Sequence, residues 1–170
     1  MTYSRDREWS DRFIPAISMI VGPRLLVPAP FEVDAKQATD LIVLRARDMT
    51  IAARVRRHGY ADRYPFEFTM RSRRDNGVKT ELAKVVDGWA DWMFYGHSAA
   101  DECGFDRWFL IDLHALRAAL IRDGMKERST LAWTEKPNGD GTHFVAFDLR
   151  SFRPSILVTS SHDVPTSLAA

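Results

Sequence analysis

The chain has 170 residues, of which 45% are hydrophobic and 28% are charged, and these proportions exclude a disordered, collagen-like or mucin-like protein. The single cysteine, Cys103, excludes an internal disulfide and a multi-thiolate zinc site and fits a reducing compartment. No run approaches the roughly 18 apolar residues of a membrane span, and the first residues are charged where a signal peptide would be apolar. We therefore expect a cytoplasmic protein with one domain over residues 1–159 and a flexible tail over 160–170.

The net charge of +1 hides an uneven distribution of charge. Residues 45–79 contain ten basic and four acidic side chains, and arginine supplies 19 of the 24 basic residues of the chain. The planar guanidinium suits bidentate binding of phosphate or carboxylate, so this segment is typical of a surface for nucleic acid or for an acidic protein. An ordinary solvated surface remains the alternative. The arginines that we expect to contact phosphate are Arg45, Arg47, Arg54, Arg56, Arg57, Arg71, Arg73 and Arg74.

The first half of the chain predicts a helix followed by three strands. Residues 50–57 alternate, with Arg54 and Arg56 on the face opposite Val55, and a short link before this strand favours an antiparallel hairpin with the strand that precedes it. The third strand alternates as well, with Phe68 on one face and Glu67 on the other. The predicted elements are a helix over 10–21, kinked at Pro15, and strands over 40–46, 50–57 and 66–73.

The second half predicts a long helix, a strand, a helix and a hairpin. Apolar residues at helical spacing favour a helix over 78–95, and Asp112 is placed to cap a helix that ends at Gly124. A turn at 138–141 predicts a hairpin within residues 129–152. The fold class is therefore α/β or α+β, a central mixed sheet flanked by helices in the order α-β-β-β-α-β, followed by a helix and a C-terminal hairpin.

This order, together with Asp40-Leu41 at the start of a strand, resembles the restriction-endonuclease-like PD-(D/E)XK superfamily over residues 36–112. The resemblance implies a nuclease-like fold and a Mg²⁺-dependent phosphodiesterase acting on nucleic acid, DNA in preference to RNA. The sequence departs from the motif at Ile51–Arg56, which contains neither the expected acid nor the expected lysine. The active-site motif is thus degenerate.

Two sets of residues can replace the missing acid and lysine. In some members of that superfamily these groups have migrated to the following helix, where Glu81 and Lys84 stand here, and Glu67 is a second candidate acid. The candidate catalytic residues are Asp40, Glu67, Glu81 and Lys84, with Asp40 and Glu81 as the Mg²⁺ ligands. Each also has an ordinary structural interpretation as a strand start, a cross-strand partner or first-turn helix charge.

Other interpretations stay open at this point. The protein can be a non-catalytic interaction protein, a phage- or defence-related modulator, whose arginines bind nucleic acid or an acidic protein surface. A homodimer is also compatible with the sequence. His97, near the end of the predicted long helix, is a candidate helix cap or, with Asp87 and Asp91, a weaker candidate metal ligand.

Overall fold

A computed structural model describes residues 3–28, 41–43, 49–74 and 77–165 of the chain. The chain divides into two compact units, residues 1–49 and residues 50–170. Among the described residues, no helix combines the length and apolar character needed to cross a membrane. The elements in chain order are α1 (Tyr3–Asp11), α2 (Ile14–Val21), η1 (Gly22–Leu25), β1 (Leu26–Pro28), β2 (Leu41–Val43), β3 (Ile51–Arg56), α4 (Tyr60–Arg63), β4 (Glu67–Arg74), α5 (Glu81–Val86), β5 (Trp92–Ser98), β6 (Phe105–Asp112), α6 (Leu113–Gly124), β7 (Trp133–Pro137), β8 (Thr142–Asp148), η2 (Leu149–Ser151), η3 (Pro154–Ile156) and β9 (Leu157–Ser160).

The described residues of the first unit form two short α-helices, a 3₁₀ turn and a small antiparallel ribbon. The predicted single helix over 10–21 is wrong in its boundaries, because α1 ends at Asp11 and α2 begins at Ile14. Pro15 lies in the first turn of α2, where its missing N–H costs no hydrogen bond, so it begins a helix rather than kinking one. β1 and β2 pair with each other in antiparallel register.

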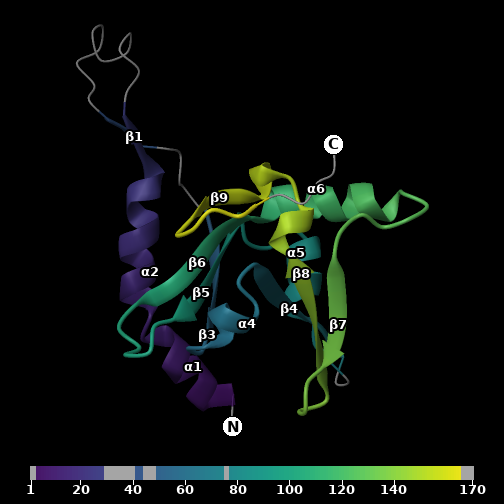
Figure 1. Ribbon diagram of the computed structural model, residues 1–170, viewed down its shortest axis with the longest axis horizontal. Coiled ribbons are helices and arrows are strands. Elements are labelled where there is room, and N and C mark those ends of the chain that lie inside the picture. Colours follow the sequence, from purple (N-terminus) through teal and green to yellow (C-terminus); the bar gives the residue numbers. More distant parts are fainter. Residues whose placement is uncertain (1–2, 29–40, 44–48, 75–76, 166–170) are drawn as a thin grey trace, which may run out of the picture. The chain divides into compact units, whose positions relative to one another are not determined.

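The second unit contains two sheets (Figure 1). A mixed four-stranded sheet has the order β3-β5-β6-β9, in which β3 is parallel to β5 and the other pairs are antiparallel. A three-stranded antiparallel sheet has the order β4-β8-β7. This mixed content of helices and two sheets confirms the predicted α+β class. The predicted hairpin between residues 40–46 and 50–57 is wrong, because the described part of the first strand pairs with β1, whereas β3 pairs with β5.

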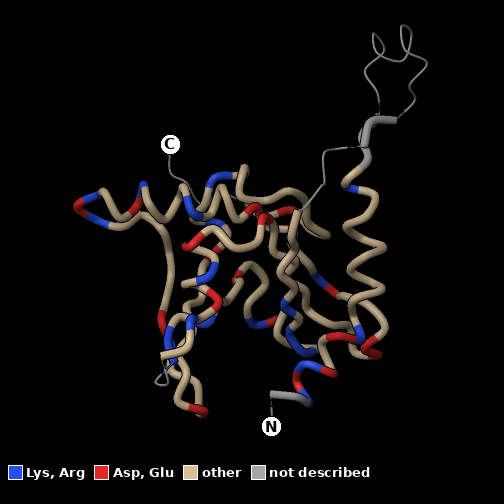
Figure 2. Tube along the Cα trace, turned by 180° about the vertical axis from the view of Figure 1, so that it is seen from behind, with Lys and Arg blue, Asp and Glu red and all other residues tan. Residues whose placement is uncertain are grey.

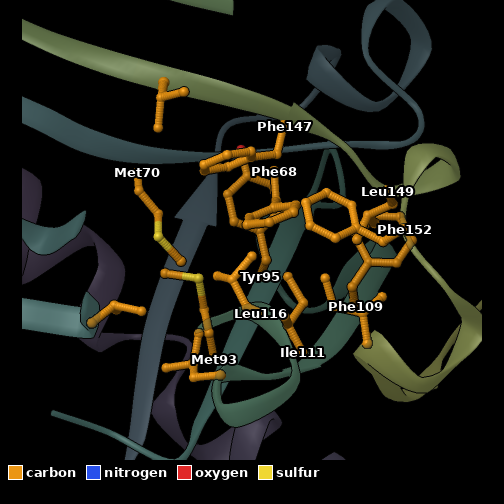
Figure 3. Close-up of a cluster of buried hydrophobic side chains, with 14 residues drawn as sticks. Phe68, Met70, Met93, Tyr95, Phe109, Ile111, Leu116, Phe147, Leu149 and Phe152 are labelled. Carbon is orange, nitrogen blue, oxygen red and sulfur yellow. The ribbon is translucent and has the colours of Figure 1, made fainter. Parts of the chain in front are cut away.

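The apolar core of this unit lies between the two sheets and α6. Phe68 stacks on Phe147 with ring centroids 5.2 Å apart, and both rings lie near Phe152 and Tyr95 (Figure 3). Leu116 of α6 belongs to the same cluster. The core residues of the three-stranded sheet come from one face of β4 and β8, which leaves the other face of β4 free for polar side chains.

The predicted helix over 78–95 is the largest error of the sequence analysis. The helix α5 covers only Glu81–Val86, and residues 92–98 form β5. Gly88 has φ +91° and Ala90 has φ +60°, which end the helix, and the N–H of Thr50 donates to the Asp91 carboxylate at 2.8 Å. Aromatic side chains that follow this turn favour a strand, and a strand places them in the core as well as a helix would.

The elements after β5 follow the sequence more closely. The Asp112 side chain accepts a hydrogen bond from the N–H of Ala115 and caps α6, as predicted. The predicted hairpin is formed by β7 and β8. The strand β9 ends at Ser160, the first residue of the predicted tail, and the N–H of Ser161 donates to the carbonyl of Trp108. Residues 166–170 lie outside the described residues.

We predict that Gly96→Ala destabilises the protein by about 1–3 kcal/mol, the usual cost of overpacking a core. An added Cβ at Gly96 would lie 2.6 Å from Cε1 of Phe105 and 2.9 Å from Cε1 of Phe94. Urea denaturation measures the free energy of unfolding. The matched control is Gly104→Ala, whose Cβ meets nothing within 4 Å, and equal stability of the two variants would contradict the packing described for β5.

Candidate functional site

A polar cleft of about 230 Å³ lies in the second unit, and its walls come from both sheets and from α4. The three-stranded sheet and the hairpin loop contribute a carboxylate, hydroxyls, an amide and two cations. The four-stranded sheet contributes two arginines, a tyrosine and a histidine, and α4 with the residue after it contributes two tyrosines. In chain order, the lining residues are Arg54, Arg56, Tyr60, Tyr64, Glu67, Thr69, Arg71, Tyr95, His97, Lys136, Asn138, Thr142 and Phe144.

Strand alternation sends the polar residues of β4 into this cleft. Phe68 and Met70 are fully buried in the core, and the intervening positions Glu67, Thr69 and Arg71 line the cleft. The alternation expected from the sequence is confirmed here. A single strand therefore separates the apolar core from the polar cleft.

The register of β3 and β5 determines which side chains form the other wall of the cleft. Arg54 is the register partner of Tyr95, and Arg56 is the register partner of His97. Partners in register lie on the same face of a sheet, so the two arginines point to the same side as Tyr95 and His97. This face changes along the strands from apolar, at Met93, to cationic, at Arg56. Figure 2 shows basic and acidic positions interspersed along the Cα trace.

Two contacts fix which residues of the walls oppose each other. The hydroxyl of Tyr95 lies 3.2 Å from Oγ1 of Thr69, and both groups are buried. The guanidinium of Arg107, the register partner of His97, lies 5.4 Å from the centre of the Phe66 ring. Moving from Tyr95 to His97 therefore leads toward the Glu67 end of β4 and away from Arg71.

Glu81 links β3 and β4 at the end of the cleft opposite Glu67. Its Oε2 accepts a hydrogen bond from Arg54 Nη1 at 2.5 Å and a second one from the backbone N–H of Arg71 at 3.2 Å. The carboxylate predicted to bind Mg²⁺ thus neutralises an arginine of the cleft. The side chains of Arg54 and Glu81 are 21% and 27% exposed, so solvent screens the pair only in part.

Two further cations of the cleft, Arg56 and Lys136, lie beside aromatic rings. The guanidinium of Arg56 lies 4.8 Å from the centre of the Tyr60 ring, and Nζ of Lys136 lies 5.3 Å from the centre of the Tyr64 ring. The centres of the two tyrosine rings are 6.3 Å apart. Such contacts stabilise a cation while leaving its hydrogen-bond donors available to a ligand.

His97 is the most buried ionisable side chain lining the cleft, with 1% of its surface exposed. Burial lowers the pKa of His97 from 6.5 to about 4, and the positive charges of Arg56 and Arg107 add to this effect. A backbone hydrogen bond with Arg107 and the charge of Asp106 act in the opposite direction but are weaker. His97 is therefore neutral at pH 7. It lies in β5, one residue before the end of that strand, so the predicted role as a helix cap is wrong.

The structure brings together part of the predicted site. Arg54, Arg56, Arg71 and Glu67 line the cleft. Lys84 is exposed on α5, with Nζ 6.0 Å from the centre of the Trp89 ring, and it does not line the cleft. The predicted residues Asp40, Arg45 and Arg47 lie outside the described residues.

The other predicted arginines lie on β4 or at the end of β3 and do not line the cleft. Arg57 is exposed. Arg73 donates to Nε2 of His143 at 2.7 Å, and Arg74 is the register partner of Thr142.

The predicted Mg²⁺ site stays a prediction. Glu67 is the one carboxylate among the described residues that line the cleft, and the described part of the chain contains no group of three or more histidine, cysteine, aspartate or glutamate side chains placed to hold a metal ion. Asp40, the other expected ligand, is not among those residues.

Sequence reasoning missed Tyr60, Tyr64 and Lys136, and it placed His97 near the end of a helix. A strand over 92–98 would have put Tyr95 and His97 on one face by alternation, but the helical spacing of nearby apolar residues hid that pattern. Tyr60, Tyr64 and Lys136 have no local signal, since only tertiary packing brings α4 and β7 to the same cavity.

Comparison of this chain with models of known protein families, with curated proteins and with solved structures gives no match. The site is therefore interpreted from its own geometry.

We predict that Glu81→Ala lowers the free energy of unfolding by about 1–2 kcal/mol, because Arg54 and the N–H of Arg71 lose their shared acceptor. Chemical denaturation measures this change. Glu127→Ala, in the exposed segment after α6, is the control and should leave stability unchanged within about 0.5 kcal/mol. A Glu81→Ala variant as stable as the control would contradict the structural role of this carboxylate.

We predict that His97 makes the protein less stable in acid. Because the pKa of His97 is about 4 in the folded protein and 6.5 when unfolded, the unfolded chain binds more protons between these values. Stability contributed by neutral His97 is complete above pH 6.5 and decreases as the pH falls to 4, by roughly 3 kcal/mol at about 1.4 kcal/mol per unit.

The measurement is the free energy of unfolding from pH 7 to pH 4 for the protein and for His97→Gln. The protein should lose more stability than the variant over this range, since the carboxylates, including Asp123 with a pKa of about 2, are common to both. Parallel losses would show that His97 is not buried in its neutral form.

Proposed function

We propose that this protein binds nucleic acid in the cleft, with backbone phosphate against the cations and a base or sugar against the tyrosines. The observation that carries the proposal is the convergence of Arg56, Arg71 and Lys136 with Tyr60 and Tyr64 in one cavity. Guanidinium and ammonium groups bind phosphate, and tyrosine rings stack on bases of any sequence.

The size of the cleft supports a single strand as the ligand. A cavity of about 230 Å³ is smaller than the usual pocket for a drug-sized ligand, so it can take only a small part of a strand and is far too small to enclose a duplex. Single-stranded regions expose unstacked bases, which is the form that aromatic side chains recognise. DNA and RNA share this chemistry, and the binding assay separates them.

A concave site supports a small anionic group better than the acidic surface of a protein, which was the alternative partner expected from the sequence. Arg56 and Lys136 lie in a cleft beside tyrosine rings, whereas contact with a protein surface requires an accessible patch of about 800 Å² on each partner. An acidic protein partner is nevertheless an outcome that the assay below can reveal.

Phosphodiester cleavage with Mg²⁺ is a second candidate function. The location of Glu67 among the cations favours it, because a carboxylate beside phosphate-binding groups can hold a metal ion or accept a proton. The hydrogen bond between Arg54 and Glu81 counts against Asp40 and Glu81 as the pair of Mg²⁺ ligands. Binding therefore stands as the main proposal, on a fold that we propose to be nuclease-like.

The test is the fluorescence anisotropy of labelled single-stranded DNA, single-stranded RNA and duplex DNA across a range of salt concentrations. We expect single strands to bind more tightly than duplex, with affinity falling steeply as salt rises. Arg56→Gln and Arg71→Gln should each weaken binding about tenfold and reduce the slope against log salt by about 0.7, because each removes one phosphate contact.

The matched control is Arg122→Gln with Arg153→Gln, which removes two exposed arginines that do not line the cleft. An equal loss of affinity in this control would contradict binding in the cleft, and no binding at low salt would favour the acidic protein partner. A parallel incubation with Mg²⁺ or EDTA separates binding from cleavage. Metal-dependent cleavage that is lost in Glu67→Gln would establish the second candidate.

A further inference from the structure

The cleft has an exposed mouth and a deeply buried end. Tyr60 is 42% exposed and Asn138 is exposed, so these residues form the mouth. Thr69, Tyr95 and His97 are 5%, 2% and 1% exposed and form the deep end. Arg56 lies beside His97 in register and reaches from this end to the Tyr60 ring.

Two polar atoms at the deep end have no hydrogen-bond partner among the described residues. Nδ1 of His97 and Nε of Arg56 are both shielded from solvent and unpaired. Buried polar atoms in folded proteins are nearly always hydrogen-bonded, and leaving one unpaired costs about 1–3 kcal/mol. Both residues line the cleft and are register partners, and two unpaired atoms on them point to a ligand that supplies their partners.

The charges around these two atoms indicate which chemical class of ligand would fit. Arg56 on β3 and Arg107 on β6 both act on His97, and their summed charge opposes its protonation. Asp106 on β6 acts weakly in the opposite sense, and Glu67 is the carboxylate that β4 contributes to the cleft. The cleft lining as a whole has four cationic side chains and one carboxylate, so a small anion with several acceptor oxygens would reduce this excess of positive charge and accept the unused hydrogen bond of Arg56.

A phosphate monoester fits this description better than a phosphodiester. A monoester carries up to two negative charges and three unesterified oxygens, whereas a diester carries one charge and two such oxygens. A monoester also connects to the rest of its molecule through one bond, so it can occupy the buried end while the nucleotide extends toward the tyrosines at the mouth.

We propose that the deep end of the cleft is a subsite for a terminal phosphate, held by Arg56 and His97, so that the protein recognises the phosphorylated end of a nucleic acid strand. This inference rests on the proposed function, because it assigns one part of the same cleft. No covalent step is involved. The negative charge of the bound phosphate favours the protonated form of His97, so binding raises the pKa of this residue from about 4.

The first experiment compares the affinities of one oligonucleotide sequence with a 5′-phosphate, with a 3′-phosphate and with hydroxyl groups at both ends. We expect one of the phosphorylated forms to bind at least tenfold more tightly than the hydroxyl form. A nucleoside monophosphate, used as a competitor, tests whether a free nucleotide is recognised as well as a strand end. The preference should disappear in His97→Gln and Arg56→Gln and persist in His162→Gln, an exposed histidine that does not line the cleft.

The second experiment needs no substitution and therefore does not depend on whether a variant folds. The imidazole resonances of His97 are followed by NMR across pH in the presence and absence of inorganic phosphate. We expect the pKa of His97 to rise by about one unit or more with phosphate, while the resonances of the exposed His162 serve as the control for nonspecific phosphate effects.

The outcomes separate this inference from the proposed function. Equal affinity for all three oligonucleotides, together with an unchanged pKa of His97, would overturn the terminal-phosphate subsite and leave strand binding in the cleft intact. Absence of binding to any oligonucleotide, with a phosphate-dependent rise in the pKa of His97, would support the subsite and overturn nucleic acid as its source. The nucleoside monophosphate then becomes the ligand to test.

Discussion

The hydrogen-bond contact between Tyr95 and Thr69 joins the two sheets of residues 50–170 at the boundary between the core and the cleft. The Tyr95 ring packs among the core aromatics, with its centre 6.4 Å from that of Phe68, and its hydroxyl lies 3.2 Å from Oγ1 of Thr69. Both polar atoms are buried and satisfy each other, so the interior changes from apolar to polar without an unpaired group at the boundary. The positions of His97 and Glu67 follow from this contact, because each lies two residues farther along the same strand face.

The cleft places several positive charges in a partly buried site, which costs free energy of desolvation. Contacts with neighbouring side chains offset part of that cost. Glu81 neutralises Arg54, and the rings of Tyr60 and Tyr64 stabilise the cations of Arg56 and Lys136. His97 avoids the cost by remaining neutral. What remains at one end of the cleft is unused hydrogen-bonding capacity, because Nε of Arg56 and Nδ1 of His97 have no partner among the described residues, and perturbed groups of this kind are characteristic of a binding site.

The alternation of residues along single strands predicted part of the candidate site from the sequence. The period of two in residues 50–57 and 66–71 was enough to predict that Arg54, Arg56, Arg71 and Glu67 share strand faces, and all four line the cleft. Alternation could not predict that these strand faces point into the cleft, because that depends on which strands pair. The parallel partners β3 and β5 are separated in the sequence by α4, β4 and α5. No local sequence pattern specifies that these two strands pair. The helix expected over 78–95 failed for a related reason, since Val85 and Met93 are core residues in either conformation and only the backbone at Gly88 and Ala90 decides between them.

The same nonlocal pairing has a consequence for how the cleft forms. Its cations come from β3, β4 and β7, and its buried histidine comes from β5, so no single hairpin contains the site. The strand β3 gains its register with β5 only after the chain has passed through β4, and β4 gains its partner only when β8 is in place. Pairings of such high sequence separation form late and cooperatively, because the entropy of closing the intervening loops must be overcome first. The binding groups therefore converge only in the complete fold of residues 50–170, which makes the integrity of both sheets a condition for any activity of the cleft.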